Sequence, residues 1–188
     1  MMINAVLDAC TLYPAPLRDL LLRLAQAGLL FPFWSEEIRN EWVRSLLRNR
    51  PDLKQEKLER TCREMDAHFP NSLVRGFEFL LPTLTLPDPK DKHILAAAIH
   101  AKAEFIVTFN LKDFPDTILQ PYGIEAILPD EFVMRLIQRA PILVFQVVRN
   151  HRLGLVRPPQ TVDEYLATLE KQGLFQTVAF LRKHKDEI

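Results

Sequence analysis

Residues 86–115 read LPDPKDKHILAAAIHAKAEFIVTFNLKDFP, and this stretch decides the fold class that the sequence predicts. An Asp-Pro pair followed by an alanine-rich run predicts a helix over residues 88–103. The apolar run FIV within residues 104–110 then predicts a buried strand that ends in polar residues from Thr108 onward. A helix that leads directly into a buried strand is typical of α/β proteins with a parallel sheet.

The same alternation continues on both sides of this stretch. Extended segments are expected as a buried strand at 3–9, a link at 31–34, a strand within 72–87 and another strand at the start of 123–137. Helices are expected at 17–30, 35–50, 51–70 and the end of 123–137. We therefore expect an α/β fold. Residues 131–188 have no strand pattern and are expected to form a helical C-terminal extension, with a helix after Thr161.

Composition sets outer bounds on function. The 188 residues are enough for one domain with a sizeable core and a small appendage. Lys and Arg together number 24 and are balanced by 24 Asp and Glu, so total charge indicates no partner. We see neither a secretory leader nor an apolar run of about 20 residues, and expect a cytoplasmic protein without a membrane span. Cys10 and Cys62 match no metal or redox spacing and are expected to be reduced thiols.

Acidic side chains follow the predicted strands at the points where the strands end. Asp8 comes directly after the apolar run INAVL, and Asn110 and Asp113 follow the strand at 104–110. Because ligands of parallel sheets bind outside the carboxyl ends of the strands, these side chains are expected at one edge, near Asp91 in the first turn of its helix. Glu41, in the helix that begins near residue 35, is a further candidate.

Each acid also has a structural interpretation that the sequence leaves open. Asp91 suits the first turn of a helix, where a carboxylate interacts favourably with the helix dipole. Asp113 suits a turn, and Glu41 suits a solvated helix face. Asp8 has the fewest structural alternatives, because a charge directly after a buried strand needs compensation.

Clustered carboxylates repel one another, and hard divalent cations relieve that repulsion. Mg²⁺ and Mn²⁺ prefer oxygen ligands, keep several waters and suit phosphoryl substrates. The pattern therefore indicates metal-assisted hydrolysis of a phosphodiester bond.

Four stretches resemble the PIN-domain ribonucleases, and within them the VapC-type toxins of bacterial toxin–antitoxin pairs: AVLDACTLYP (5–14), SEEIRNEWVRSL (35–46), residues 86–115 and GIEAILPDEF (123–132). The most specific feature is an acid before an alanine-rich helix, then a strand and T-x-N-x-x-D-F. The resemblance implies a parallel sheet of about five strands between helices. It also implies a PIN-like nuclease domain over 1–130 and a helical extension over 131–188.

The resemblance further implies roles for individual residues. Asp8, Glu41, Asp91 and Asp113 match the acids that bind Mg²⁺ or Mn²⁺; with Asn110 they form the implied catalytic set, and Thr108 supports it. Asp88 lies one turn too early and is expected to cap the helix. The implied activity is RNA cleavage, and the implied partners are a cognate antitoxin and a second copy in a homodimer.

One position departs from the family pattern. Cys10 stands where many family members carry a polar residue, which alters the expected hydrogen bonding around Asp8.

The sequence also leaves three alternatives to a toxin nuclease open. The segment DACT also resembles a phosphatase motif with a nucleophilic aspartate, but Cys10 occupies the position where that motif needs a second aspartate. A second alternative is a non-catalytic PIN-like module that binds RNA or protein. A third is a stand-alone RNA-processing nuclease instead of a toxin.

Overall fold

The computed structural model describes residues 2–188, and the chain forms two compact units. The first unit contains the chain up to Tyr13 together with Phe31–Ile127. The second contains Pro14–Leu30 and Leu128–Ile188, so it joins two stretches that are far apart in the sequence. The division into a domain over 1–130 and an extension over 131–188 remains a prediction.

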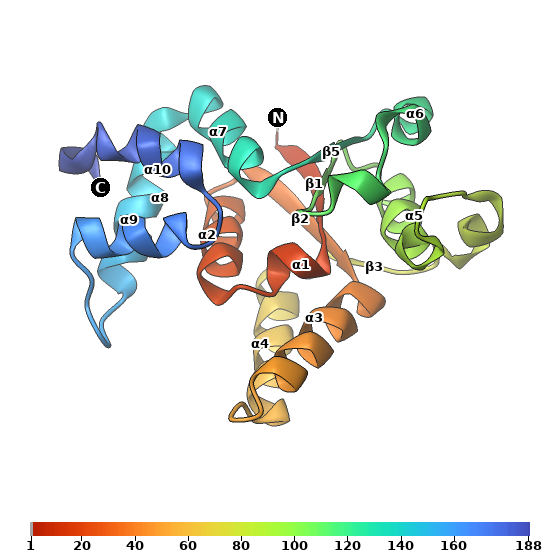
Figure 1. The fold of residues 1–188 in the computed structure, drawn as a ribbon, viewed down its shortest axis with the longest axis horizontal. Coiled ribbons are helices and arrows are strands. Elements are labelled where there is room, and N and C mark those ends of the chain that lie inside the picture. The colour runs from red at the N-terminus through yellow and green to blue at the C-terminus, as the bar shows by residue number, and fades with distance from the viewer. Residues whose placement is uncertain (1) are drawn as a thin grey trace. The chain divides into compact units, whose positions relative to one another are not determined.

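The first unit is built on a five-stranded sheet, which confirms the predicted α/β fold (Figure 1). The strands are β1 (Ile3–Leu7), β2 (Leu30–Ser35), β3 (Leu73–Val74), β4 (Phe105–Val107) and β5 (Glu125–Ile127), in the order β3-β2-β1-β4-β5. The segment expected to be an extended link at 31–34 is part of β2. Its burial on alternate residues and its place beside β1 give it strand pairing that its length alone does not predict.

The register of the central strands brings their carboxyl ends to one edge. β1 pairs in parallel with β4, with Leu7 opposite Val107, and β4 pairs in parallel with β5, with Val107 opposite Ile127. The backbone amide of Asp8 donates to Val107 O at 3.1 Å, and that of Thr108 donates to Ile127 O at 3.0 Å. The residues that directly follow β1 and β4 are therefore held by the sheet itself.

The helices of the first unit are α1 (Ala9–Leu12), α3 (Glu36–Asn49), α4 (Gln55–His68), α5 (Lys92–His100) and α6 (Asp116–Leu119). Ser35 caps α3 by accepting a hydrogen bond from the Ile38 amide. α5 is buried from His93 to Ala98 and packs on β1 and β4. It begins later than predicted, because residues 89–91 form a 3₁₀ turn in which the Asp88 side chain accepts from the Lys90 amide at 2.9 Å.

The second unit is helical, as predicted for the C-terminal region. It contains α2 (Ala15–Gln26), α7 (Pro129–Arg139), α8 (Pro141–Gly154), α9 (Val162–Glu170) and α10 (Phe175–Arg182). The expected capping box at Thr161 is present, with Glu164 as its partner. α2 ends before the predicted residue 30, because Gly28 adopts a positive φ of 79° that breaks the helix.

Buried polar groups hold the second unit together. His151 Nδ1 lies 2.9 Å from the Tyr165 hydroxyl, and His151 Nε2 lies 3.0 Å from Asp19 Oδ2. These contacts link α2, α8 and α9. The buried Asp130 carboxylate accepts from the amides of Gln176 and Thr177 at 2.8 and 2.9 Å, which joins the start of α7 to the start of α10.

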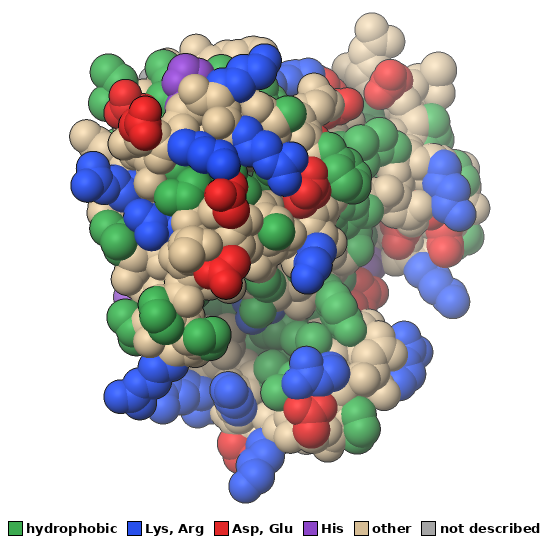
Figure 2. All heavy atoms as spheres, turned by 60° about the vertical axis from the view of Figure 1, so that its left-hand side comes forward, with side chains coloured by type: hydrophobic (Ala, Val, Ile, Leu, Met, Phe, Trp, Pro, Cys, Tyr) green, Lys and Arg blue, Asp and Glu red, His purple; other side chains and the backbone are tan. Residues whose placement is uncertain are grey.

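Basic side chains of the second unit are paired with acids in several places. Arg182 pairs with Glu170, and Lys185 pairs with Asp163. Figure 2 shows basic, acidic and hydrophobic side chains mixed over one face of the molecule. Within residues 2–188, no helix has both the length and the apolar character that crossing a membrane requires.

Candidate functional site

Asp8 lies between β1 and α1 and is buried, with 7% of its surface exposed. Its Oδ1 accepts a hydrogen bond from the Ala9 amide at 2.5 Å. Its Oδ2 accepts one from the Thr108 hydroxyl at 2.6 Å and one from Cys10 Sγ at 3.0 Å. These donors compensate the charge that the sequence places at the end of a buried strand.

Cys10 is a free thiol that acts as a hydrogen-bond donor to Asp8. Burial, and then the negative charge of Asp8, raise the pKa of the Cys10 thiol to about 12, so the thiol keeps its proton at neutral pH. Cys10 Sγ also accepts from the Phe109 amide at 3.4 Å. The polar residue that many family members carry here is therefore replaced by a thiol that still makes hydrogen bonds.

Asp91 lies at the end of the 3₁₀ turn that precedes α5, and its side chain makes no capping hydrogen bond. The cap of that turn is Asp88, as predicted. Burial, and then the charges of Asp8, Asp88 and Asp113 in that order, together raise the pKa of the Asp91 carboxyl to about 6. The Asp91 carboxylate therefore lies within electrostatic reach of both Asp8 and Asp113.

Asn110 and Asp113 belong to the short loop after β4. The Asn110 side-chain amide donates to Asp113 Oδ2, and the Asn110 backbone amide donates to the Thr108 hydroxyl at 3.0 Å. Thr108 is fully buried and thus connects this loop to Asp8. One hydrogen-bonded chain joins Asp8 at the end of β1 to Asp113 beyond the end of β4.

Glu41 contacts His93, a residue that was not among the candidates predicted from the sequence. Its Oε1 lies 3.2 Å from Nε2 of His93, which is in the first turn of α5. His93 is 9% exposed, and its Nδ1 has no hydrogen-bond partner among the residues that the structure describes. Burial lowers the pKa of His93, but the contact with Glu41 and the charges of Glu41, Glu37 and Asp8 outweigh it and raise the pKa overall.

The sequence around His93 does not indicate a functional role, because its contact with Glu41 joins α5 to α3, which are far apart in the sequence. The available signal was its place two residues after Asp91, directly before the apolar run ILAAA.

A pocket of about 810 Å³ opens beside Asp8 and Glu41. Its lining combines these two acids with basic, aromatic and polar side chains: Tyr13, Trp42, Arg44, Ser45, Arg48, Asn49 and Lys90, together with Ala9 and Cys10. All of these residues belong to the first unit. The lining of this pocket is therefore mixed in charge, with two acids and three basic side chains.

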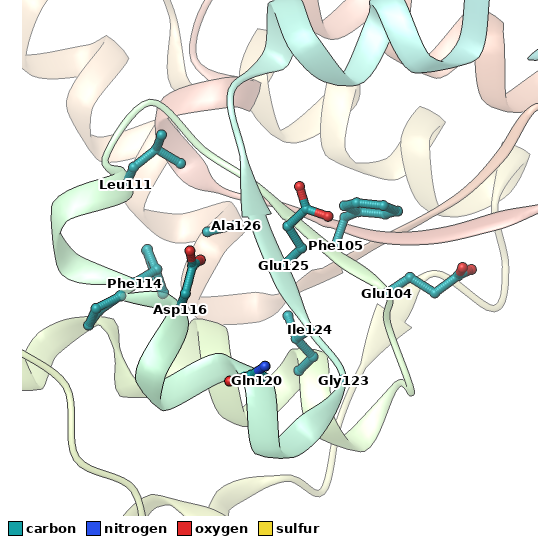
Figure 3. A pocket seen from close by; sticks show the side chains of 11 residues that line it. Glu104, Phe105, Leu111, Phe114, Asp116, Gln120, Gly123, Ile124, Glu125 and Ala126 are labelled. Atoms are coloured by element: carbon teal, nitrogen blue, oxygen red, sulfur yellow. The ribbon is translucent and has the colours of Figure 1, made fainter. Parts of the chain in front are cut away.

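A second pocket, of about 780 Å³, lies beside β4 and β5 (Figure 3). The close-up shows the Glu125 carboxylate next to the Phe105 ring, and Asp116 near Phe114. Among the described residues that line it there is none of the six predicted site residues. We therefore take the pocket beside Asp8 as the candidate site.

Some of the predicted site residues are hydrogen-bonded to one another, and others interact only through charge. Asp8 and Thr108 are in direct contact, as are Asn110 and Asp113, while Asp91 interacts with Asp8 and Asp113 through charge. Within residues 2–188, no three His, Cys, Asp or Glu side chains are close enough together to hold a metal ion as they stand. The chemical type of these groups nevertheless fits a hard cation, because they are carboxylate oxygens, and because burial and then the neighbouring acids raise the pKa of Asp91.

A sequence profile of the PIN domain matches residues 4–112, which is more than half of the chain. The chain belongs to the PIN-domain family. Residues 129–183 match the VapC50 C-terminal domain, which corresponds to the helical region beyond β5. The resemblance to PIN-domain proteins of the VapC type is thereby confirmed.

A relative in Mycobacterium tuberculosis (strain ATCC 25618 / H37Rv), named "Putative ribonuclease VapC50", is 37% identical to this chain over 106 residues. The aligned region covers 55% of this chain and 63% of that protein, so it spans less than two thirds of the relative's length. No solved structure matches the chain significantly.

Proposed function

We propose that the chain is a metal-dependent endoribonuclease that hydrolyses RNA phosphodiester bonds, and that it is the toxin of a type II toxin–antitoxin pair. The observation that carries this proposal is the gathering of Asp8, Asp91 and Asp113 at the carboxyl edge of the sheet of a PIN-domain protein. The likeness to a protein named as a ribonuclease supports the choice of RNA as substrate.

In this proposal Asp8, Asp91, Asp113 and Glu41 hold a divalent cation, Mg²⁺ or Mn²⁺. When bound, the cation lowers the pKa of a bound water and offsets negative charge on the scissile phosphate. Few protein ligands are needed at once, because Mg²⁺ keeps several waters in its coordination sphere.

The chain's own residues fix the orientation of these acids. Thr108 and Cys10 hold the Asp8 carboxylate by hydrogen bonds, and Asn110 holds that of Asp113. Thr108 and Asn110 are therefore supporting groups in the proposed mechanism. A raised pKa keeps part of the Asp91 population protonated near pH 6 in the protein without metal, and loss of that proton accompanies cation binding.

The proposed partners follow from the proposed activity and from the likeness to VapC-type proteins. RNA with an exposed, single-stranded backbone is the substrate, because cleavage needs access to the phosphodiester. A cognate antitoxin inhibits the toxin by inserting a segment that sets an arginine against the carboxylates. We further propose a homodimer, and action in the cytoplasm, where the RNA substrate lies.

The deciding experiment is cleavage of labelled total RNA by purified protein with Mg²⁺, with Mn²⁺ and with chelator, beside the Asp8→Asn variant. Cleavage that needs both the metal and Asp8 supports the nuclease. Absence of cleavage, together with absence of metal binding by calorimetry, would instead favour a non-catalytic PIN-like module. Toxicity on expression, relieved by the product of a neighbouring small reading frame, separates a toxin from a stand-alone processing nuclease.

A further inference from the structure

One face of α3 lines the pocket beside Asp8. The lining residues of this helix include Glu41, Arg44, Ser45, Arg48 and Asn49, spaced three and four residues apart. Residues with that spacing lie on one side of a helix. The helix therefore presents an acid near the carboxylate cluster and two arginines farther along the same face.

The two arginines on this face differ from the other arginines of the α3 region. Arg39 pairs with Asp66, and Arg50 pairs with Asp52. Arg44 and Arg48 pair with no carboxylate among the residues that the structure describes, and both are exposed.

The helix dipole accounts for only part of this pattern. A cation in the last turn of a helix is favourable, and Arg48 is in the last turn of α3. Arg44 lies more than one turn from the end, where the dipole effect has faded. Arg44 Nε donates to the Asn40 carbonyl at 3.1 Å, and the remaining N–H groups of its exposed guanidinium can bind an anion that is not part of the chain.

An aromatic side chain, Tyr13, lines the same pocket. Tyr13 is half-buried at the end of α1, and its hydroxyl accepts a hydrogen bond from Asn49 Nδ2 at 3.1 Å. Asn49 is one residue beyond Arg48 on α3, so the hydrogen bond ties the ring to the basic end of the helix face. An aromatic ring fixed beside cations is a common arrangement for binding single-stranded nucleic acid.

We propose that this face is the RNA-strand subsite of the nuclease: Arg44 and Arg48 bind consecutive backbone phosphates beside the scissile bond, and Tyr13 stacks on one base. The proposal rests on the ribonuclease function proposed above. The two arginines are four residues apart, which is about 6 Å along the helix axis. That spacing is comparable to the separation of neighbouring phosphates in an extended strand.

The two arginines would offset the repulsion between the RNA phosphates and the acids of the pocket. The chain as a whole has a formal net charge of zero, so it offers RNA no general attraction. Asp8 and Glu41 repel a phosphate that approaches the same pocket. Arg44 and Arg48, farther along the same face of α3, offset that repulsion and hold the strand in register with the carboxylates.

The test measures RNA binding without cleavage. A fluorescein-labelled single-stranded RNA is titrated with full-length Asp8→Asn protein over a range of NaCl concentrations, and anisotropy gives the dissociation constant. Arg44→Ala/Arg48→Ala in this background should reduce the slope of log affinity against log salt by about 1.4, because each phosphate contact contributes about 0.7 for single strands.

A matched control changes the same charge elsewhere. Arg60→Ala/Arg63→Ala removes two exposed arginines from α4, which contributes no residue to the lining described for the pocket, and should leave the slope unchanged. Tyr13→Ala should weaken binding about 5- to 150-fold, whereas Tyr13→Phe, which keeps the ring, should bind like the parent.

Equal slopes for the α3 and α4 double variants, or no measurable RNA binding by the Asp8→Asn protein, would overturn the subsite. Cleavage by the protein that retains Asp8 tests the proposed function separately. If that protein cleaves, the α3 double variant should raise KM and leave kcat nearly unchanged; an unchanged KM overturns the subsite alone. If it does not cleave with any metal, the nuclease proposal fails, and the salt slopes still decide whether α3 binds RNA.

Discussion

Replacing Thr108 with valine tests how the chain stabilises the charge of Asp8. The Thr108 hydroxyl is fully buried, donates to Asp8 Oδ2 at 2.6 Å and accepts from the Asn110 amide at 3.0 Å. A hydrogen bond to a charged group contributes about 1.5–3 kcal/mol, and one between neutral groups about 1 kcal/mol. The added methyl group of valine recovers about 0.8 kcal/mol. We expect Thr108→Val to lower the free energy of unfolding by about 2–3 kcal/mol.

The assay is urea unfolding at pH 7 without metal, followed by tryptophan fluorescence. Both tryptophans, Trp34 and Trp42, are fully buried in the first unit, so the signal reports on the unit that contains Thr108. Thr108→Ser is the matched control, since it keeps the hydroxyl, and it should recover most of the lost stability. In a thermal scan the valine variant should melt about 4–12 °C lower.

Two results would refute this reasoning. If Thr108→Val were as stable as the parent to within about 0.5 kcal/mol, the hydroxyl would not be stabilising Asp8. If serine were as destabilising as valine, the loss would come from packing of the threonine methyl group and not from the hydrogen bonds.

The remaining predictions address other acids. Asp88→Asn should retain most RNA-cleaving activity, because asparagine caps nearly as well, whereas Asp91→Asn should be inactive; equal loss in both would reverse their assignment. Asp130→Ala should lower the free energy of unfolding by about 1–2 kcal/mol in urea titrations followed by circular dichroism, because two backbone amides lose their acceptor. Burial alone would raise the pKa of Asp19, but the hydrogen bond and charge of His151 lower it overall. Asp19 therefore stabilises the fold above its unfolded pKa of about 3.9, and this contribution is lost as the pH falls through the lower folded value. Stability of the parent should drop more steeply below about pH 4 than that of Asp19→Asn, and parallel curves would contradict this.

The parts of the fold that could be predicted from sequence are those encoded locally. INAVL is apolar throughout and forms β1, while FIV forms β4. Ser35 and Thr161 stand where a cap is needed and accept the expected hydrogen bonds. The placement of Asp8 and Thr108 at one edge also followed from sequence, because parallel strands end on the same side of a sheet.

The parts that could not be predicted depend on contacts between distant segments. The contact between Glu41 and His93 joins two helices at residues that are 52 positions apart, and neither helix carries a local sign of it. The basic residues that line the pocket were missed for the same reason. Arg44 and Arg48 look like ordinary solvated residues until the fold sets them beside Asp8.

Asp88 and Asp91 show most directly what sequence leaves open and tertiary structure decides. They are the same residue type, three positions apart, at the start of the same helical segment, and either one suits a helix N-terminus. The Asp88 side chain accepts the Lys90 amide and so satisfies a backbone donor. Because that turn is already capped, the Asp91 carboxylate is not needed by the helix and remains close to Asp8 and Asp113, whose charges oppose its ionisation. The helix start does not need the Asp91 carboxylate, and burial together with the charges of Asp8 and Asp113 opposes its ionisation. A divalent cation would relieve both effects, which is the physical argument for the cation site proposed above.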